Sequence, residues 1–587
     1  MGWASAGLQG TAGIVRLSAS LLDRTDRHCA DFAAVKARPG LWPPPGERRR
    51  FAPWEEFPLG LVMRALDAAE FDGADVDEAV SRVLETNRSP VHPGAAVWVR
   101  HACHAYMAAG KWIADELGDV AVVPQRHPRV VQSGSAAELR MLTAWGRWYE
   151  SPDGSVREFR RLRMSRIGEA EAPSVAAISF VAAAGRRAVG NVYRDAPVQV
   201  IDDERAPTRI RVVEVMLDDD VVPRVLVDAT PEEVRRRYRN GGMQVAQRIV
   251  AGGDRRPGAE CVECKLRASC DELPYVPGLL GLGDAGTHRR TWSVTTGRQY
   301  LVCPAQAQMR ELRLPADRFD GGPAARRGVV VHQWLELAHR RGRACGLVDL
   351  PEPDAADIGI AAQVMTAEEY REARPYLLAH LAVCPLAGPG RVTDLMVEPS
   401  VAAYDPVADV VVIADPDLVR RVDGRVVYRE QKTTAGAVPA GGPREVFSRV
   451  PQLALAVLLI RQGVFGRDGD GVVELEVMTP AGAAVHAFGV ADPAVVGAAR
   501  EEVARMVTGW HRDVAFRARP GHWCARCPVA RWCPDRSEGA DPDAPIEVDG
   551  ARIDPRTGEV LDGPVSGRAA AVSAVISEPV ADEDIAY

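Results

Sequence analysis

The stretch IADPDLVRRVDGRVVYREQK, residues 413–432, decides how the second half of this 587-residue chain folds. Its valine-rich segments predict two strands joined by a short hairpin at residues 422–424. Side chains alternate along a strand, so Glu430 and Lys432 point to the same face of the second strand. The hairpin brings this face beside Asp417, which we expect at the end of the first strand. The stretch therefore predicts a pocket of two carboxylates and one ammonium group.

This pocket has the chemistry of a divalent-metal site. Carboxylate oxygens suit a hard cation such as Mg²⁺, which needs few protein ligands. The ammonium of Lys432 can orient or help to deprotonate a water and can stabilise negative charge. Only four lysines are present beside 68 arginines, and a lysine retained against that bias indicates a position that needs an ammonium. The alternative is a surface hairpin that carries a Glu–Lys pair.

The neighbouring sequence predicts a mixed α/β domain. Apolar residues at helical spacing predict helices, and valine-rich runs broken by Asp, Pro and Gly predict strands. The expected order is a helix at 328–341, strands at 392–404, 409–421 and 424–434, a buried helix at 451–463 and a strand at 471–480. Alternation of this kind is typical of a sheet flanked by helices.

Two sets of four cysteines follow the same pattern. Each set has one early cysteine and a distant C-x2-C-x5-C motif, and the gaps of 232 and 221 residues are nearly equal. The first set is Cys29, Cys261, Cys264 and Cys270, and the second is Cys303, Cys524, Cys527 and Cys533. Three cysteines, Cys103, Cys345 and Cys384, belong to neither set. The pattern predicts a duplicated domain in which each copy is tied from start to end by a metal or a cluster.

These motifs divide the chain into four parts. We expect a first domain at 1–275, a linker at 276–287, a second domain at 288–536 and a tail at 537–587. The tail contains twelve acidic residues and three arginines and is expected to be disordered. The chain before it is close to neutral, although the whole carries a net charge of −8.

Composition limits the class of protein. The longest apolar run is too short to cross a bilayer, and the first residues lack the pattern of a signal peptide, which predicts a cytoplasmic protein with no membrane partner. In a reducing compartment, spaced cysteines are more often metal ligands than disulfides. No G-x-x-x-x-G-K-[ST] motif occurs, so a helicase acting with this chain would be a separate subunit.

The second domain resembles the PD-(D/E)XK nuclease superfamily, in the RecB-like branch with an iron–sulfur cluster that AddB-type and CRISPR-associated nucleases share. The motifs occur in the family's order between the TTGRQYLVCP opening and the ARPGHWCARCPVARWC end. The matching positions are His332, Glu398, Asp417, Glu430, Lys432 and Gln452, with Asp415 as a close competitor for Asp417. Two positions depart from the family pattern: Ala414 replaces a glycine, and Ala456 replaces the tyrosine of the glutamine motif.

The resemblance implies a fold and a set of cofactors. It implies two tandem restriction-endonuclease-like domains, each with a mixed central sheet flanked by helices. Mg²⁺ or Mn²⁺ would be bound by His332, Asp417 and Glu430, with Glu398 or Asp415 as further ligands, while Lys432 and Gln452 act in catalysis. Each four-cysteine set would hold a four-iron four-sulfur cluster, with zinc as the alternative.

The first domain carries the cysteines without the catalytic residues. Its equivalent core stretch is expected at 142–164, where Ala144 and Trp145 occupy the place of the aspartate. Arginines Arg160, Arg161 and Arg163 occupy the place of the Glu–Lys pair. The domain is therefore expected to be inactive. Either its arginines bind DNA phosphates, or the domain is a platform with a purely structural role.

These observations predict a metal-dependent deoxyribonuclease. We expect it to hydrolyse phosphodiester bonds of single-stranded DNA or DNA ends, in repair, recombination or defence. The alternative is a non-catalytic subunit that binds DNA or a helicase through the two domains with four-cysteine sets. The departures from the family pattern at Ala414 and Ala456 favour this alternative.

Overall fold

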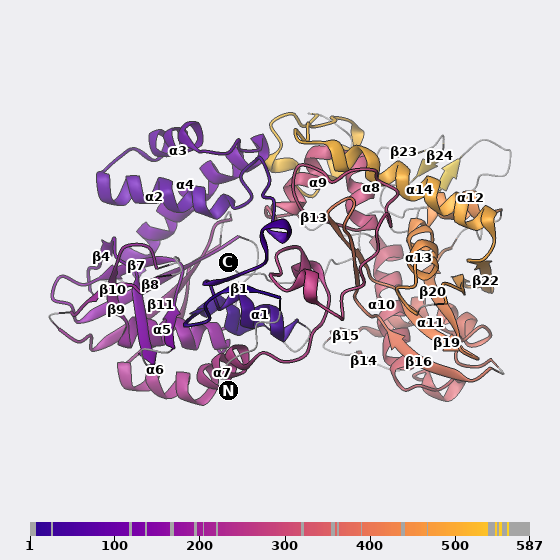
Figure 1. Cartoon of the computed structure of the whole chain (residues 1–587), viewed down its shortest axis with the longest axis horizontal. Helices are drawn as coiled ribbons and strands as arrows, with labels where there is room; N and C mark the ends of the chain where they lie inside the picture. Colours follow the sequence, from indigo (N-terminus) through magenta and orange to yellow (C-terminus); the bar gives the residue numbers. More distant parts are fainter. Residues whose placement is uncertain are drawn as a thin grey trace.

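The fold was analysed in a computed structural model of the whole chain. The structure describes residues 7–24, 28–116, 120–134, 138–164, 169–192, 196–203, 205–218, 221–317, 322–353, 358–360, 363–388, 390–435, 441–466, 468–537, 546–548, 551–553 and 560–562. The first half of the chain forms the indigo-to-magenta lobe in Figure 1, and the second half forms the lobe in rose and orange. No helix in these ranges is both long and apolar enough to span a membrane.

A five-stranded mixed sheet forms the centre of the second half. Its order is β16-β19-β20-β21-β22, with β20 and β21 parallel and the other pairs antiparallel. The strands are β16 (Val392–Val397), β19 (Leu418–Val422), β20 (Arg425–Thr433), β21 (Gly471–Thr479) and β22 (Gly482–Gly489). The mixed α/β class predicted from the sequence is therefore observed.

Two of the predicted strands are each divided. Residues 392–404 form β16 and β17 (Val401–Asp405), and residues 409–421 form β18 (Val410–Ala414) and β19. β18 pairs with β17 and β13 (Arg290–Trp292) in a separate small sheet. The expectation that Asp417 ends a strand is wrong, because Asp417 directly precedes β19. The physical reason is Pro416, which has no N–H for a sheet ladder and separates the two strands.

The hairpin between β19 and β20 is a tight turn, as predicted. Its residues Asp423 and Gly424 have φ values of 51° and 85°. Both values lie in the left-handed region that a two-residue type I′ loop requires, and Asp-Gly is a favoured sequence there. The turn fixes the register that pairs Leu418 with Arg429.

Helices cover the sheets of the second half. They are α8 (Val294–Val302), α9 (Pro304–Glu311), α10 (Gly322–Arg340), α11 (Ala367–Leu381), α12 (Pro443–Arg449), α13 (Pro451–Arg461) and α14 (Pro493–Arg512). The predicted helices around 328–341 and 451–463 correspond to α10 and α13. Residues 453–460 of α13 are all buried and form the centre of the largest core, packed against β20, β21 and α14. A short hairpin of β14 (Ile358–Ile360) and β15 (Gln363–Met365) lies beside α10.

The first half contains a sheet of the same topology. Its order is β12-β11-β8-β7-β4, again with one parallel pair, β8 with β11, among antiparallel ones. A second sheet, β10-β9-β5-β6-β2, includes a parallel pair followed by an antiparallel one, as β13-β18-β17 does. The strands are β1 (Gln9–Gly10), β2 (Ile14–Ser18), β3 (Leu41–Trp42), β4 (Val123–Gln125), β5 (Arg129–Gly134), β6 (Leu139–Thr143), β7 (Arg147–Glu150), β8 (Val156–Arg163), β9 (Arg186–Val189), β10 (Gln199–Ile201), β11 (Arg209–Met216) and β12 (Arg224–Ala229).

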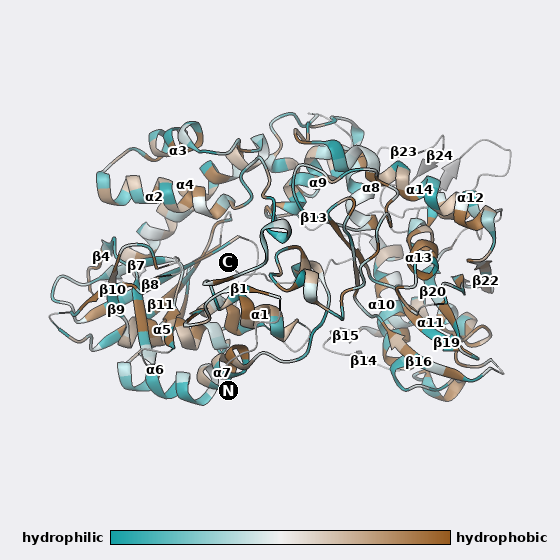
Figure 2. Cartoon of the chain, viewed as in Figure 1, coloured by the Kyte–Doolittle hydropathy of each residue, from teal (hydrophilic) through white to brown (hydrophobic). Residues whose placement is uncertain are grey.

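The helices of the first half differ in polarity. They are α1 (Ala30–Lys36), α2 (Pro58–Asp72), α3 (Val76–Thr86), α4 (Pro93–Glu116), α5 (Pro173–Ala184), α6 (Pro231–Arg237) and α7 (Met243–Ala251). α5 packs on the sheets and is brown in Figure 2, whereas the more exposed α6 is largely teal. α6 and α7 are joined by a π-helical turn at Tyr238–Gly242.

The two halves pack against each other at both cysteine motifs. Cys303, Cys527 and Trp532 belong to one core with helices α2 and α4 of the first half. Reciprocally, Cys261 packs with Tyr404 and other residues of β17 and β18. The segment expected as a linker is also packed, because its leucines are buried in the core of the second half and Asp405 accepts hydrogen bonds from its backbone. Each half therefore depends on the other for part of its burial.

The acidic tail contains regular structure. Strands β23 (Ile546–Val548), β24 (Ala551–Ile553) and β25 (Val560–Asp562) form an antiparallel sheet. The expectation of a wholly disordered tail is thus wrong for these residues. The remainder of the tail lies outside the described residues.

Candidate metal-dependent active site

The Glu–Lys pair of β20 lies on one face of the strand. Lys432 Nζ lies 2.8 Å from Glu430 Oε1, and the Glu430 side chain is only 3 % exposed. Period-two alternation on β20 produces this arrangement, as the sequence predicts. The pair stands at the buried centre of the sheet, because β20 is flanked by β19 and β21.

Three further side chains converge beside this pair. His332, Glu398 and Asp417 each offer a ligand atom, and these atoms all lie within 4.8 Å of one another. His332 Nδ1 is 3.3 Å from Asp417 Oδ1. His332 comes from α10, Glu398 from the turn after β16 and Asp417 from the residues that precede β19. Four separate segments of the second half thus supply one pocket.

Backbone hydrogen bonds hold the acids in place. The N–H of Gln431, between the two members of the Glu–Lys pair, donates to Asp417 Oδ2 over 2.5 Å. The N–H of Glu398 donates to the carbonyl oxygen of Asp417 over 3.1 Å. Glu398 has a φ of 48°, a left-handed conformation that is uncommon for a residue with a side chain. Such conformations cluster at functional sites, and here the turn directs the carboxylate toward Asp417.

The pocket is electrostatically crowded. Burial and the charge of Asp417 raise the pKa of Glu398 to about 8, and Glu430 adds to the effect. Although burial opposes it, the charge and hydrogen bond of Asp417 raise the pKa of His332 to about 9. Although burial again opposes it, His332 and Lys432 lower the pKa of Asp417. Acids this close together repel one another, and a cation among them relieves that repulsion.

Two predicted residues lie differently. Asp415 is exposed and is not a member of the converging group, so Asp417 is the better placed of the two aspartates. Gln452 lies in the first turn of α13, and its Oε1 is buried without a hydrogen-bond partner among the described residues. That oxygen is free to accept a hydrogen bond from a ligand.

Sequence reasoning missed one acid near the pocket. Glu336 follows His332 by one turn of α10, and its charge contributes to the raised pKa of Glu398. Glu336 also pairs with Arg340 at 2.5 Å. The His-x3-Glu spacing on an amphipathic helix was the signal, since residues four apart lie on the same helix face.

A family comparison adds to this geometry. Residues 291–534 match the family model described as the PD-(D/E)XK nuclease superfamily. This part of the chain is a PD-(D/E)XK nuclease superfamily domain. Members of that superfamily are generally metal-dependent nucleases, which agrees with the carboxylate pocket. A search of curated proteins found no match.

The second cysteine set lies at the end of the nuclease domain. Cys303, Cys524, Cys527 and Cys533 line one pocket, together with residues that include Arg519 and Trp523. Backbone N–H groups of Arg519 and Gly521 donate to Cys303 Sγ at 3.3 Å and to Cys524 Sγ at 3.5 Å. Burial raises the pKa of the Cys527 thiol to about 12, and the other three cysteines add to the shift.

The first cysteine set has matching local geometry. Burial raises the pKa of Cys264 to about 12, with contributions from Cys261, Cys29 and Cys270. The N–H of Gly258 donates to Cys261 Sγ at 3.4 Å, as Gly521 does to Cys524 in the nuclease domain. Both motifs consist of two short 3₁₀ turns, Ala259–Val262 and Arg267–Ser269 in the first and His522–Arg526 and Ala530–Trp532 in the second.

The three arginines that the sequence predicts in place of a Glu–Lys pair all lie close to acids. Arg160 pairs with Glu158 at 2.7 Å and Arg161 pairs with Asp23 at 3.2 Å. Arg163 lies 3.8 Å from Glu214 on the neighbouring strand β11. All three are at most 13 % exposed. These guanidinium groups are held by internal acids, which favours the structural role over phosphate binding.

Proposed function

We propose that residues 288–536 hydrolyse phosphodiester bonds of DNA in a reaction that requires a divalent cation. The observation that carries this proposal is the convergence of His332, Glu398 and Asp417 within 4.8 Å, beside the 2.8 Å Glu430–Lys432 pair. An imidazole and several carboxylates form a mostly oxygen donor set, which fits Mg²⁺ or Mn²⁺. Burial and the charge of Asp417 raise the pKa of Glu398 to about 8, and a bound cation would offset the repulsion between these acids.

His332, Asp417 and Glu430 would hold the ion, with Glu398 as a further oxygen ligand. Such an ion lowers the pKa of a bound water and stabilises charge on a phosphate. Lys432 is held in place by Glu430, and it would orient the attacking water and stabilise negative charge on the phosphate. Gln452 would accept a hydrogen bond from the substrate or from Lys432 through its buried oxygen.

We further propose that each four-cysteine set holds a four-iron four-sulfur cluster. The four cysteines of the second set line one pocket, and backbone N–H groups donate to their sulfurs, as is common around such clusters. Sulfurs on one tetrahedral zinc would be about 3.8 Å apart, given Zn–S bonds of about 2.3 Å. Among the described residues, the groups with ligand atoms within 4.8 Å of one another include neither cysteine set. That wider spacing favours a cluster over a single zinc ion.

The first half is proposed to be an inactive copy of the nuclease domain. Support comes from the shared strand order and directions of the two central sheets and from the matching cysteine motifs. Arg147 begins β7 and pairs with Arg160 of β8, just as Leu418 begins β19 and pairs with Arg429 of β20. On this register, Arg160 corresponds to Arg429. Arg161 and Arg163 then stand at the positions of Glu430 and Lys432, and the described residues of this half form no corresponding group of carboxylates. Its role would be structural.

The substrate is proposed to be single-stranded DNA or DNA ends, in repair, recombination or defence, with a separate helicase subunit as the partner. The support is the sequence resemblance to RecB-like nucleases. A cytoplasmic location is likewise a prediction from the sequence.

The test is digestion of matched substrates by the purified full-length chain with Mg²⁺, with Mn²⁺ and with a chelator. End-labelled linear and circular single strands of the same sequence distinguish attack at ends from internal cleavage, and a duplex of that sequence tests strand preference. We expect cation-dependent loss of the linear single strand. DNA binding without cleavage under every cation condition would instead favour the non-catalytic subunit.

A further inference from the structure

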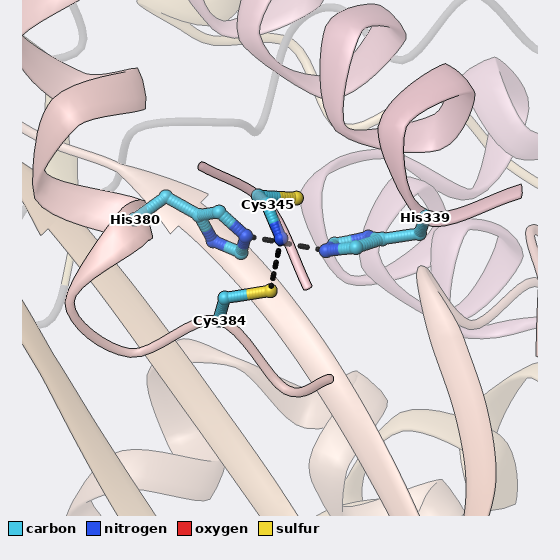
Figure 3. Close-up of side chains that lie close together, drawn as sticks. All are labelled: His339, Cys345, His380 and Cys384. Carbon is cyan, nitrogen blue, oxygen red and sulfur yellow. Dashed lines mark hydrogen bonds between the residues drawn. The ribbon is translucent and has the colours of Figure 1, made fainter. Parts of the chain in front are cut away.

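Two cysteines that belong to neither four-cysteine set lie together in the nuclease domain with two histidines. His339 is in the last turn of α10, and His380 is in the last turn of α11. Cys345 follows the end of α10, and Cys384 follows the end of α11. One ligand atom of each residue lies within 4.8 Å of the others, and all four residues are buried. Figure 3 shows the four side chains gathered at one point.

The spacing of these atoms suits a tetrahedral ion. His339 Nε2 lies 3.2 Å from His380 Nε2. Two nitrogens bound to tetrahedral zinc at about 2.0–2.1 Å would be about 3.3 Å apart. The backbone N–H of Cys345 donates to Cys384 Sγ at 3.4 Å, which is the kind of bond that stabilises a thiolate ligand. Two sulfurs with two imidazole nitrogens form a donor set typical of structural zinc.

A carboxylate orients one of the histidines. His380 Nδ1 lies 2.6 Å from Glu476 Oε1, and both side chains are fully buried. Because Nδ1 donates its proton to Glu476, the lone pair of Nε2 faces His339 and the two cysteines. Histidine ligands of zinc usually have such a partner for the second ring nitrogen. The outer part of a metal site is therefore present together with the four ligands.

We propose that His339, Cys345, His380 and Cys384 bind one structural zinc ion. The site is separate from the carboxylate pocket and from both four-cysteine sets. All four ligands come from the protein and are buried, so no position is left open for a substrate or a water. The ion fastens the ends of α10 and α11 to each other, and through Glu476 it fastens them to β21.

The position of the site connects it with the active site. α10 carries His332 two turns before His339, and Glu476 also accepts hydrogen bonds from Gln431 and Arg429 of β20. Gln431 lies between Glu430 and Lys432. Zinc would thus hold the helix and the strand that carry the proposed catalytic residues.

The first test measures metal content and coordination in the full-length chain, purified without air after growth with ample iron and zinc. We expect zinc in addition to iron, and zinc-edge X-ray absorption that fits two sulfur and two nitrogen ligands. A zinc shell of four sulfurs only, or no zinc, would overturn the proposal. So would a disulfide between Cys345 and Cys384 found by mass spectrometry in protein kept from oxidants. This test needs no variant and so does not depend on the folding of one.

The second test compares variants. A Cys345→Ala/Cys384→Ala double variant should lose one zinc per chain and keep its iron. Cys103→Ala is the matched control, because Cys103 is also buried but lies in α4 and belongs to none of the metal-ligand groups found among the described residues, and it should keep both metals. Unchanged zinc in the folded double variant would overturn the proposal. Because metal content is read independently of cleavage, a failure of the nuclease proposal would leave this result interpretable.

Discussion

The side chain of Gln431 donates a hydrogen bond to Glu476 Oε2 over 2.9 Å, on the face of the sheet opposite to Glu430 and Lys432. Its backbone N–H donates to Asp417 at the same time. One residue of β20 is thus fixed both to the carboxylate pocket and to the buried His–Cys group behind it. Precise placement of this kind is what a reaction with a positioned water requires.

The first prediction concerns the choice between two aspartates. Asp417→Asn should weaken Mn²⁺ binding by at least about 10–100-fold, the loss that even outer-shell changes cause at metal sites. The control is Asp415→Asn, which changes an exposed aspartate two residues before Asp417. This variant should bind Mn²⁺ as tightly as the wild type does. Calorimetric titration with Mn²⁺ makes the comparison. Equal losses in both variants would show that the pocket is not assembled around Asp417.

The second prediction concerns the four-cysteine set of the nuclease domain. Cys303→Ser should halve the iron content and the visible absorbance of protein purified without air, because only the first set remains. A link that closes so long a loop contributes on the order of 5 kcal/mol in the chain-entropy model, so the variant should also unfold at lower urea concentration. Cys103→Ser, in the same core as Cys303, is the control. Colourless wild-type protein that contains only zinc would contradict the cluster assignment.

The third prediction separates the two roles left open for the first half. Arg161→Ala should lower the free energy of unfolding by roughly 1.5–3 kcal/mol, the range for hydrogen bonds to charged groups, because it removes the buried partner of Asp23. The affinity for single-stranded DNA should stay the same. If Arg161 instead binds a phosphate, the variant should bind single-stranded DNA more weakly. The slope of log K against log salt concentration should then become shallower by about 0.7, the value for one phosphate contact on a single strand. Arg236→Ala, on the exposed side of α6, is the control for a general loss of charge.

The fourth prediction concerns acid stability at the contact between the two halves. Asp409 is buried and accepts hydrogen bonds from Arg289 at 2.6 Å, Tyr404 at 2.6 Å and Arg50 at 3.1 Å. Although burial opposes it, Tyr404 and the arginines lower the pKa of Asp409. A carboxylate with a lowered folded-state pKa contributes stability that is present above its unfolded pKa of about 3.9. That contribution is lost as the pH falls through the folded-state value.

Asp409→Asn should therefore lower the free energy of unfolding by roughly 1.5–3 kcal/mol at pH 7, the range for hydrogen bonds to charged groups. The difference from the wild type should be constant above about pH 4 and should narrow below it. Urea midpoints across that pH range measure this. Asp470→Asn, which removes an exposed pair with Arg425, should change little. A difference that grows toward low pH would contradict the assignment.

Much of the nuclease domain was predictable from local patterns. The valine-rich runs, the Asp-Gly turn and the apolar run of α13 each specify their element with few contacts from elsewhere. Alternation on β20 was enough to place Glu430 and Lys432 on one face. The division at Pro416 was missed because two valine runs that flank a proline resemble one long strand.

The site behind the sheet was not predictable in the same way. Its ligands are His339 and Cys345, six residues apart, and His380 and Cys384, four residues apart. Each pair combines one histidine with one cysteine, and neither is a C-x2-4-C or H-x3-5-H pair of the common zinc motifs. The two pairs are brought together only by the packing of α10 on α11. The three unassigned cysteines were visible in the sequence, but which of them meet is decided by tertiary structure.

The central claim is that the Glu430–Lys432 pair is catalytic. The most direct measurement compares Mn²⁺-dependent cleavage of labelled single-stranded DNA by the wild type, Lys432→Met and the control Lys111→Met, which changes an exposed lysine of α4. We expect Lys432→Met to reduce the rate by at least about 100-fold while iron content and urea midpoint stay near wild type, and Lys111→Met to cleave normally. Wild-type rates for folded Lys432→Met would contradict the account.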